Sequence, residues 1–215
     1  MPAWPQVVEH PTVAHRLSEL RHRSTGHDRF RQLVEEITTF LAYEALRDLG
    51  TSPQRVPTPV GVAQGRRVSE RLVVVPVLRA GLGMVPGVAR VAPECEVAHL
   101  GMRRDERTLA ADCYLDGLPA DLSGRRVLVC DPMLATGGSL VSACSLVLSR
   151  HPAGLAALCL VASQPGLDHL RDRLGQIPVV CAAVDPRLDR HGFIVPGLGD
   201  AGDRLFGPPA SRRGA

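Results

Sequence analysis

Five apolar runs, continuous rather than alternating with polar residues, most strongly constrain how this chain folds. They are Arg71–Leu78, Cys95–Met102, Arg125–Cys130, Gly154–Ser163 and Ile177–Asp185. A strand that is apolar at nearly every position is typical of a parallel sheet, because such a strand is buried on both faces. Helix-like segments at residues 139–150 and 166–174 separate some of these runs. The pattern predicts the α/β class, with a doubly wound and mainly parallel sheet.

The first fifty residues precede every strand signal and are predicted to be helical. One apolar helix face is indicated by the i, i+3, i+4, i+7 spacing of Phe30, Leu33, Val34, Ile37 and Leu41. Gly50 is placed to cap the end of that helix. Residues 50–59, which are polar and rich in proline, are expected to form a connector, and residues 208–215 a frayed tail. Without a domain-scale linker, the sequence predicts one domain over residues 1–215.

All 25 basic residues are arginines, because the sequence contains no lysine. This excludes the lysine of a Walker phosphate loop and a Schiff-base lysine. The net charge of +3 is too small to indicate a nucleic-acid partner, and no apolar run reaches the ~18 residues of a membrane span. The six cysteines form no C-x-x-C pair. With no signal-peptide pattern at the N-terminus, free thiols in a cytoplasmic protein are expected.

Ligands of open α/β sheets bind beyond the carboxyl ends of the strands, so the loops after the apolar runs form the candidate site. The first loop, Arg79–Met84, combines an arginine with two glycines, and Arg79 could bind phosphate oxygens in a fork. The second, Arg103–Leu109, mixes arginines with acids. It is interpreted either as a solvated, salt-bridged loop or as an arm that closes over an anionic leaving group through Arg104.

The stretch VLVCDPMLATGGSL, residues 127–140, joins a strand directly to a predicted helix start. Residues 136–139 lie at the helix N-terminus, where unpaired N–H groups and the positive end of the helix dipole bind phosphate. Asp131 stands at the strand end, where it could accept hydrogen bonds from sugar hydroxyls. This predicts a cradle for a phosphate monoester and a polyol.

The C-terminal stretch HGFIVPGLGDAGDRLFG, residues 191–207, is rich in glycine and holds apolar residues close to those glycines. It is interpreted as a rigid loop whose backbone contacts a small, flat ligand. Asp203 is expected to form a structural pair with its neighbour Arg204.

These motifs resemble the uracil phosphoribosyltransferase family of type I phosphoribosyltransferases. The stretch around Asp131 resembles the ribosyl-diphosphate signature of all type I enzymes, whereas LRAGLGM and the C-terminal stretch resemble the uracil enzymes in particular. The resemblance covers roughly residues 26–207. It implies that uracil and 5-phospho-α-D-ribose 1-diphosphate give UMP and diphosphate, with Mg²⁺ as cofactor, in pyrimidine salvage.

The resemblance also implies roles for individual residues. Those implied in catalysis are Arg104, Asp131 and Asp200, and Asp200 would also face magnesium through water. Those implied in binding the ribosyl diphosphate are Arg79, Arg104, Asp131, Pro132, Met133, Leu134, Ala135, Thr136, Gly137, Gly138, Ser139 and Asp200. Those implied in binding uracil, mainly through backbone groups, are Ile194, Gly199, Asp200 and Ala201.

Some positions depart from the family pattern. Phe193 and Arg103 stand where tyrosine is usual, and Pro86 stands where aspartate is common. The family further implies a homo-oligomer, a dimer or larger, and GTP as a possible allosteric effector.

Two alternatives stay open. One is a non-catalytic regulator of the same fold that senses nucleotides and binds RNA. The other is a phosphoribosyltransferase for a different base, although purine enzymes usually carry paired acids where Pro132 follows Asp131.

Overall fold

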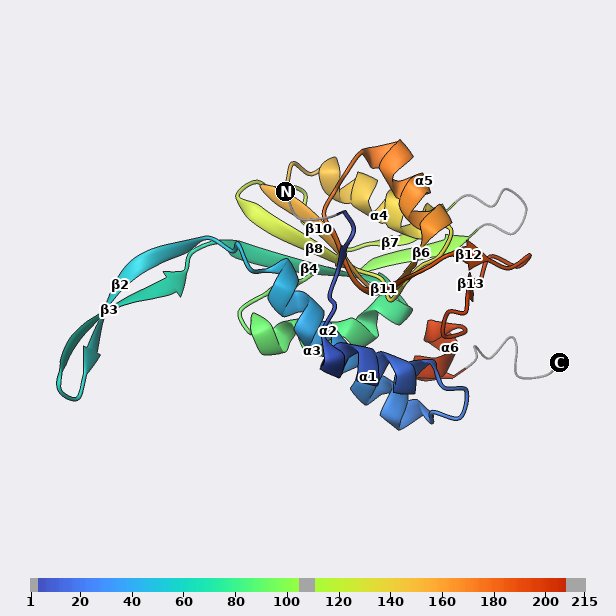
Figure 1. The fold of residues 1–215 in the computed structure, drawn as a ribbon. Helices are drawn as coiled ribbons and strands as arrows, with labels where there is room; N and C mark the ends of the chain where they lie inside the picture. The colour runs from blue at the N-terminus through green and yellow to red at the C-terminus, as the bar shows by residue number, and fades with distance from the viewer. Residues whose placement is uncertain (1–3, 105–110, 208–215) are drawn as a thin grey trace.

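The computed structural model describes residues 4–104 and 111–207. Its centre is a sheet (Figure 1). The strand order is β1-β11-β10-β8-β4-β6-β7, with β5 beside β4 and β9 beside β10. The strands are β1 (Gln6–Val7), β4 (Arg71–Leu78), β5 (Glu96–Val97), β6 (Leu100–Arg104), β7 (Ala111–Asp116), β8 (Arg125–Cys130), β9 (Met133–Leu134), β10 (Gly154–Ser163) and β11 (Val179–Asp185). Among these described strands only β6 and β7 pair antiparallel. The predicted α/β class with a mainly parallel sheet is confirmed.

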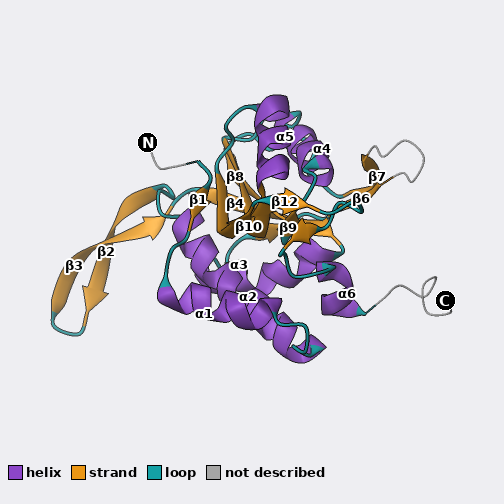
Figure 2. Ribbon diagram, turned by 45° about the vertical axis from the view of Figure 1, so that its right-hand side comes forward, coloured by secondary structure: helices purple, strands orange, loops and turns teal. Residues whose placement is uncertain are grey.

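Helices cover both faces of this sheet (Figure 2). They are α1 (Pro11–Arg21), α2 (His27–Ala45), the 3₁₀ helix η1 (Ala80–Met84), α3 (Val85–Val91), α4 (Gly138–Leu148), α5 (Gln164–Leu174) and α6 (Ala201–Phe206). Successive β4 side chains enter different cores: Val74 packs with α1, α2 and α3, whereas Val73 packs with α4 and α5. Burial on both faces is why the apolar runs are continuous.

The predicted N-terminal helices are present, but the predicted role of Gly50 is wrong. Helix α2 ends at Ala45, and the capping residue Leu46 donates its N–H to the Ala42 carbonyl. Gly50 instead leads into a strand, and its N–H donates to the Glu70 carboxylate at 2.9 Å. The glycine thus precedes a strand and does not end the helix.

The predicted connector over residues 50–59 is also wrong. It forms β2 (Thr51–Thr58), which pairs antiparallel with β3 (Gly61–Val68) in a hairpin that stands away from the sheet (Figure 1). Both strands are almost entirely exposed. The prolines favour a connector over a strand, because proline has no N–H to donate to a neighbouring strand. In a two-stranded ribbon each strand has a free edge, where a residue without an N–H is tolerated.

Other differences lie where strands are short. The run at residues 95–102 is broken into β5 and β6, while β1 and β7 were not predicted. Only residues 103–104 of the expected arm belong to a described strand; the rest of it, residues 105–109, and the expected tail at residues 208–215 lie outside the described residues. None of the helices within residues 4–104 and 111–207 has both the length and the apolar character that crossing a bilayer requires.

Candidate functional site

Strands β4 and β8 are neighbours in the middle of the sheet, so their carboxyl ends lie side by side. The chain leaves these two ends in opposite directions. After β4 it passes through η1 and α3 to β6, and after β8 it passes through α4 to β10 on the other side. Such a reversal is where ligands bind in open α/β sheets. The two loops predicted to bind the ribosyl diphosphate therefore start at the same place.

The loop after β4 is fixed against the end of β8. A Cβ atom on Gly81 would overlap the Cys130 carbonyl oxygen, so only glycine allows the two backbones to approach so closely. A Cβ on Gly83 would lie 2.9 Å from a methyl carbon of Leu205, which places α6 against the same loop. Arg79, joined to Leu78 by a cis peptide bond, thus stands between β8 and α6.

Arg79 forms an ion pair with Asp203 of α6, at 3.1 Å from Nη2 to Oδ1. The Arg79 side chain is 46% exposed, so a ligand can reach it. The expected pair between Asp203 and Arg204 is wrong. Arg204 points the other way and donates to the carbonyls of Leu20, His22 and Leu198 at 2.7–2.9 Å.

Asp200 stands at the N-terminus of α6 and caps it. Its Oδ1 accepts a hydrogen bond of 2.9 Å from the Asp203 N–H, which is the usual role of an N-cap aspartate. Its Oδ2 makes no hydrogen bond to a described residue. A Cβ atom on Gly202 would lie 3.3 Å from Asp200 Oδ1 and 3.6 Å from Arg79 Nη2, so the structure brings these two predicted site residues together.

The β8–α4 loop, residues 131–139, opens a helix as predicted. Gly137 is the N-cap, with a φ of 83° that favours glycine, and α4 begins at Gly138. A Cβ on Gly137 would lie 2.9 Å from the Gly166 carbonyl oxygen, so the loop also packs closely on α5. The first N–H groups of α4 have no partner within the helix and are directed out of its end.

Not all of the β8–α4 loop faces outward. Pro132 and Leu134 are buried, and the Pro132 carbonyl accepts from the N–H groups of Leu160 and Val161. The Ala135 carbonyl accepts a 2.6 Å hydrogen bond from the Ser163 hydroxyl. These residues hold the loop on β10, and the partly exposed residues at its end are the ones a ligand can contact, namely Thr136, Gly138 and Ser139.

Asp131 is the carboxylate within this loop. Burial raises its pKa to about 7, and the Met133 N–H, 3.4 Å away, opposes the rise only weakly. A carboxylate with so few internal partners is a good acceptor for hydroxyl groups of a ligand, because a ligand donor would stabilise its charged form.

The C-terminal segment, residues 187–206, contains the predicted base-binding residues. Strands β12 (Arg187–Leu188) and β13 (Ile194–Val195) pair antiparallel, and Gly197 and Gly199 have φ values of 58° and 81°. Ile194 and Ala201 are each 4% exposed, counting backbone and side chain together. Contact of these residues with a ligand through backbone groups stays a prediction.

Arg104 is placed only as the last residue of β6. Its neighbour Arg103, one of the positions that depart from the family pattern, is 71% exposed and pairs with Asp112 at 3.3 Å. Phe193, another such position, is 43% exposed. Arg103 and Phe193 therefore stand at the surface rather than in the core.

Two contacts near the site were missed by sequence reasoning, the pairing of Arg79 with Asp203 and a pair between Arg21 and Asp185. The latter residues are 164 positions apart, and neither belongs to a motif. No local pattern carries this information, because the partner is decided by how the helices pack.

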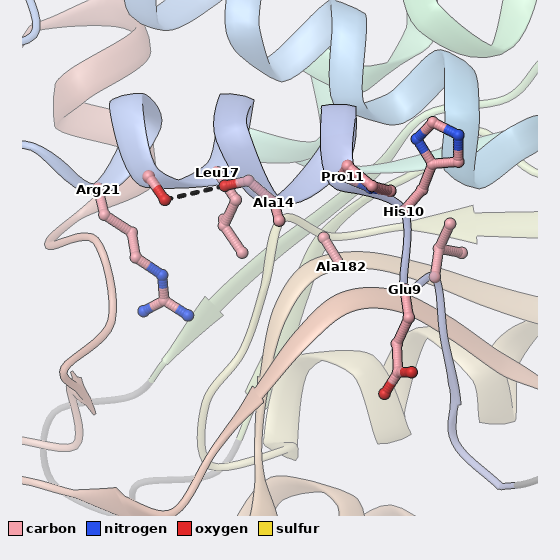
Figure 3. A pocket seen from close by; sticks show the side chains of 9 residues that line it. Glu9, His10, Pro11, Ala14, Leu17, Arg21 and Ala182 are labelled. Atoms are coloured by element: carbon pink, nitrogen blue, oxygen red, sulfur yellow. Dashed lines mark hydrogen bonds between the residues drawn. The ribbon is translucent and has the colours of Figure 1, made fainter.

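A cavity of about 440 Å³ lies elsewhere, between α1 and the sheet (Figure 3). Its lining consists of Val8, Glu9, His10, Pro11, Ala14, Leu17, Ser18, Arg21 and Ala182. None of the predicted site residues lines it. The candidate site is thus an open surface at the strand ends rather than this cavity.

Known proteins resemble this chain over nearly its whole length. The family model described as uracil phosphoribosyltransferase matches residues 7–208. A uracil phosphoribosyltransferase of Kineococcus radiotolerans is 54% identical over 94% of this chain and 97% of its own length. That of Clostridium beijerinckii is 45% identical, over 93% and 96%.

Solved structures show the same likeness. A protein of Aquifex aeolicus superposes with a TM-score of 0.89 at 35% identity, covering 95% of this chain and 98% of its own. A hypoxanthine phosphoribosyltransferase of Staphylococcus aureus superposes with a TM-score of 0.52 at 15% identity, covering 84% of each chain, and shares the fold alone.

Proposed function

The chain belongs to the uracil phosphoribosyltransferase family, and we propose that it transfers the 5-phosphoribosyl group of 5-phospho-α-D-ribose 1-diphosphate to N1 of uracil. The bond between C1 and the diphosphate oxygen breaks, the bond between C1 and N1 forms, and N1 loses its proton. The products are UMP and diphosphate. One observation carries the proposal for the site: the Arg79–Asp203 pair joins the loop after β4 to the helix that Asp200 caps.

The β8–α4 loop supports binding of the 5-phosphate. The N-terminus of α4 offers N–H groups and the positive end of an eleven-residue helix, and both favour a phosphate dianion. Thr136 and Ser139 add hydroxyl donors beside them. Asp131, at the other end of the loop, is placed to accept from the ribose hydroxyls.

Arg79 and Arg104 are proposed to bind the diphosphate. Negative charge accumulates on this leaving group as the C1–O bond breaks, and fixed cations that meet the charge lower the barrier. Asp203 holds Arg79 at the junction of the two loops, so part of the geometry exists before substrate binds.

Uracil is proposed to lie against Ile194, Gly199 and Ala201, with Asp200 beside it. A backbone N–H directed at O4 of uracil would face an amino group in cytosine, and two donors facing each other are strongly disfavoured. Reading the base through the backbone therefore provides specificity without a dedicated side chain.

Magnesium fits this donor set as a companion of the substrate. Within residues 4–104 and 111–207 no group of three or more His, Cys, Asp or Glu side chains could hold a metal, and Mg²⁺ binds readily through substrate oxygens and water with few protein ligands. Asp200 would hold it through water, since only its Oδ1 is engaged by the cap. When bound, the ion offsets charge on the diphosphate.

Product analysis tests the proposal. The protein is incubated with the ribosyl diphosphate, Mg²⁺ and each of uracil, cytosine, hypoxanthine and adenine, and the nucleotides are separated. UMP from uracil alone is expected. Turnover of another base would indicate an enzyme of different specificity, and RNA binding with steep salt dependence but no turnover would indicate a regulator.

Three broader expectations remain predictions. They are a homo-oligomer of two or more subunits, GTP as an effector, and a cytoplasmic location. The last is supported by the six cysteines, all free in the structure, because free thiols persist in a reducing compartment.

A further inference from the structure

Asp185 is a buried carboxylate outside the motifs described above. It ends β11, and its side chain is 8% exposed. A buried charge is unfavourable unless partners compensate it. We therefore expect neighbouring residues to compensate the charge of Asp185.

The partner comes from the other end of the chain. Arg21, the last residue of α1, donates from Nη1 to Asp185 Oδ2 at 2.7 Å and from Nη2 to Oδ1 at 2.9 Å. This is the two-pronged geometry of a guanidinium on a carboxylate, which is stronger and more specific than a single contact.

The same pair holds one residue of the C-terminal segment, Gly197, through both its N–H and its carbonyl group. The Gly197 N–H donates to Asp185 Oδ2 at 2.9 Å, and the Gly197 carbonyl accepts from Arg21 Nη1 at 2.8 Å. Gly197 has a φ of 58°, and a Cβ there would overlap the Ile194 carbonyl oxygen. Its conformation is therefore set by both the ion pair and the tight turn.

The next residue along the chain is held to the same end of α1. Arg204 Nη1 donates to the Leu198 carbonyl at 2.9 Å and to the Leu20 carbonyl at 2.8 Å. Its guanidinium lies 4.3 Å from the centre of the Phe30 ring. Two successive residues, Gly197 and Leu198, are thus tied to the last turn of α1 immediately before Gly199.

We propose that Arg21 and Asp185 are positioning residues for the base, which direct the backbone groups of Gly199 and Ala201 toward uracil. The inference rests on the proposed function, since it takes these backbone groups as the uracil contacts. Helix α1 then helps to set the affinity for the base without touching it. Because Gly197 precedes Gly199 by only two residues, a backbone rotation at Gly197 would redirect the N–H group of Gly199.

A structural role for the pair predicts a different outcome. Helix α1 is also anchored by Val13, Leu17 and Leu20 in the core and by Arg16, which pairs with Glu36 of α2 at 2.6 Å. Loss of Arg21 should leave α1 docked. Arg16 lies on the same helix in a partly buried ion pair with a residue of α2 and not of the C-terminal segment, so Arg16→Met is the matched control.

The experiment compares Arg21→Met, Arg21→Lys and Asp185→Asn with Arg16→Met by steady-state kinetics in both substrates. Removing charged hydrogen bonds that orient the loop is expected to raise the KM for uracil about 10-fold in Arg21→Met. The KM for the ribosyl diphosphate should stay within about 2-fold, and Arg21→Lys should recover part of the loss because it keeps the charge. Asp185→Asn still offers an acceptor to the Gly197 N–H, so its KM for uracil should lie between those of the wild type and Arg21→Met.

Three results would overturn the proposal: a KM for uracil equal to that of Arg16→Met, an equal rise in both KM values, or loss of cooperative thermal unfolding in both Arg21→Lys and Asp185→Asn. The last would mean that the pair only holds the fold. The wild-type protein is assayed alongside, and absence of UMP there would refute the proposed function itself, a result distinct from an unchanged KM in the variants.

Discussion

Two carboxylates at strand ends, Asp131 after β8 and Asp185 at the end of β11, show how differently the two halves of the site are built. Asp185 is compensated within the protein by the fork of Arg21 and the Gly197 N–H. Asp131 has only the Met133 N–H at 3.4 Å, and burial raises its pKa to about 7. Asp185 is therefore hydrogen-bonded within the protein, whereas Asp131 can still accept hydrogen bonds from a ligand.

The surrounding segments differ in the same way. The β8–α4 loop is built from consecutive residues between a strand and the helix that it opens. The C-terminal segment depends on partners far away in sequence, with Arg79 at one end and the last turn of α1 behind it. A local motif can be read directly from the sequence, but an assembled one must be seen in the fold.

The largest expected effect comes from breaking the junction between the two halves. Arg79→Ala should lower kcat about 100-fold or more, because it removes a fixed cation from the leaving diphosphate. Arg90→Ala is the control, since Arg90 is an exposed arginine of α3 paired with Glu35. Wild-type kinetics in Arg79→Ala would show that the diphosphate binds elsewhere.

Asp200→Asn should lower turnover about 10- to 100-fold, through the loss of charge beside the substrate and its magnesium. An asparagine still caps α6, so the thermal unfolding midpoint should hardly change. Asp168→Asn on the surface of α5 serves as a reference for removing one carboxylate. Equal turnover in the two variants would remove Asp200 from the site.

The raised pKa of Asp131 predicts an unusual dependence of stability on pH. The folded protein keeps a proton on Asp131 between about pH 4 and pH 7, where the unfolded chain has released it. Stability from this residue is therefore present at low pH and is lost as pH rises through 7. Between pH 4 and pH 8 the free energy of unfolding should fall further in the wild type than in Asp131→Asn, by at least about 2 kcal/mol.

Urea unfolding at both pH values measures this difference. If the free energy of unfolding changes equally in the wild type and Asp131→Asn between pH 4 and pH 8, Asp131 is ionised like an ordinary aspartate. The contrast drawn between Asp131 and Asp185 would then be wrong.

The smallest effect is expected beside Asp131. Cys130 is fully buried, and its thiol has a raised pKa because of burial. Cys130→Ser should lower the free energy of unfolding by about 1–2 kcal/mol, as it buries a hydroxyl in apolar surroundings. Its kcat/KM should match the wild type, and a loss of activity at full stability would place the thiol in the site.

How far the sequence predicts this molecule follows from the same contrast. The continuous apolar runs predict β4, β8, β10 and β11, and the glycines at the start of α4 predict the β8–α4 loop. Each of these features depends on residues that are neighbours in sequence. The β2–β3 hairpin could not be predicted from a polar, proline-containing stretch with no buried face. Adjacency in sequence predicts a pair between Asp203 and Arg204, whereas in the fold Asp203 of α6 pairs with Arg79.

The same limit applies within the site. Arg79 is predicted from a local motif and Asp200 from the family resemblance, but neither predicts that α6 joins them. Arg21 carries no local signal at all, since its role depends on the distant Asp185. Residues that act through packing are found only once the helices are placed.

A crystal structure with bound UMP tests the central claim most directly. The 5-phosphate should lie on the N–H groups at residues 136–139, with the ribose hydroxyls on Asp131. The pyrimidine should lie against the backbone of residues 194–201. A nucleotide bound in the cavity along α1, or a pyrimidine away from the C-terminal segment, would contradict the account.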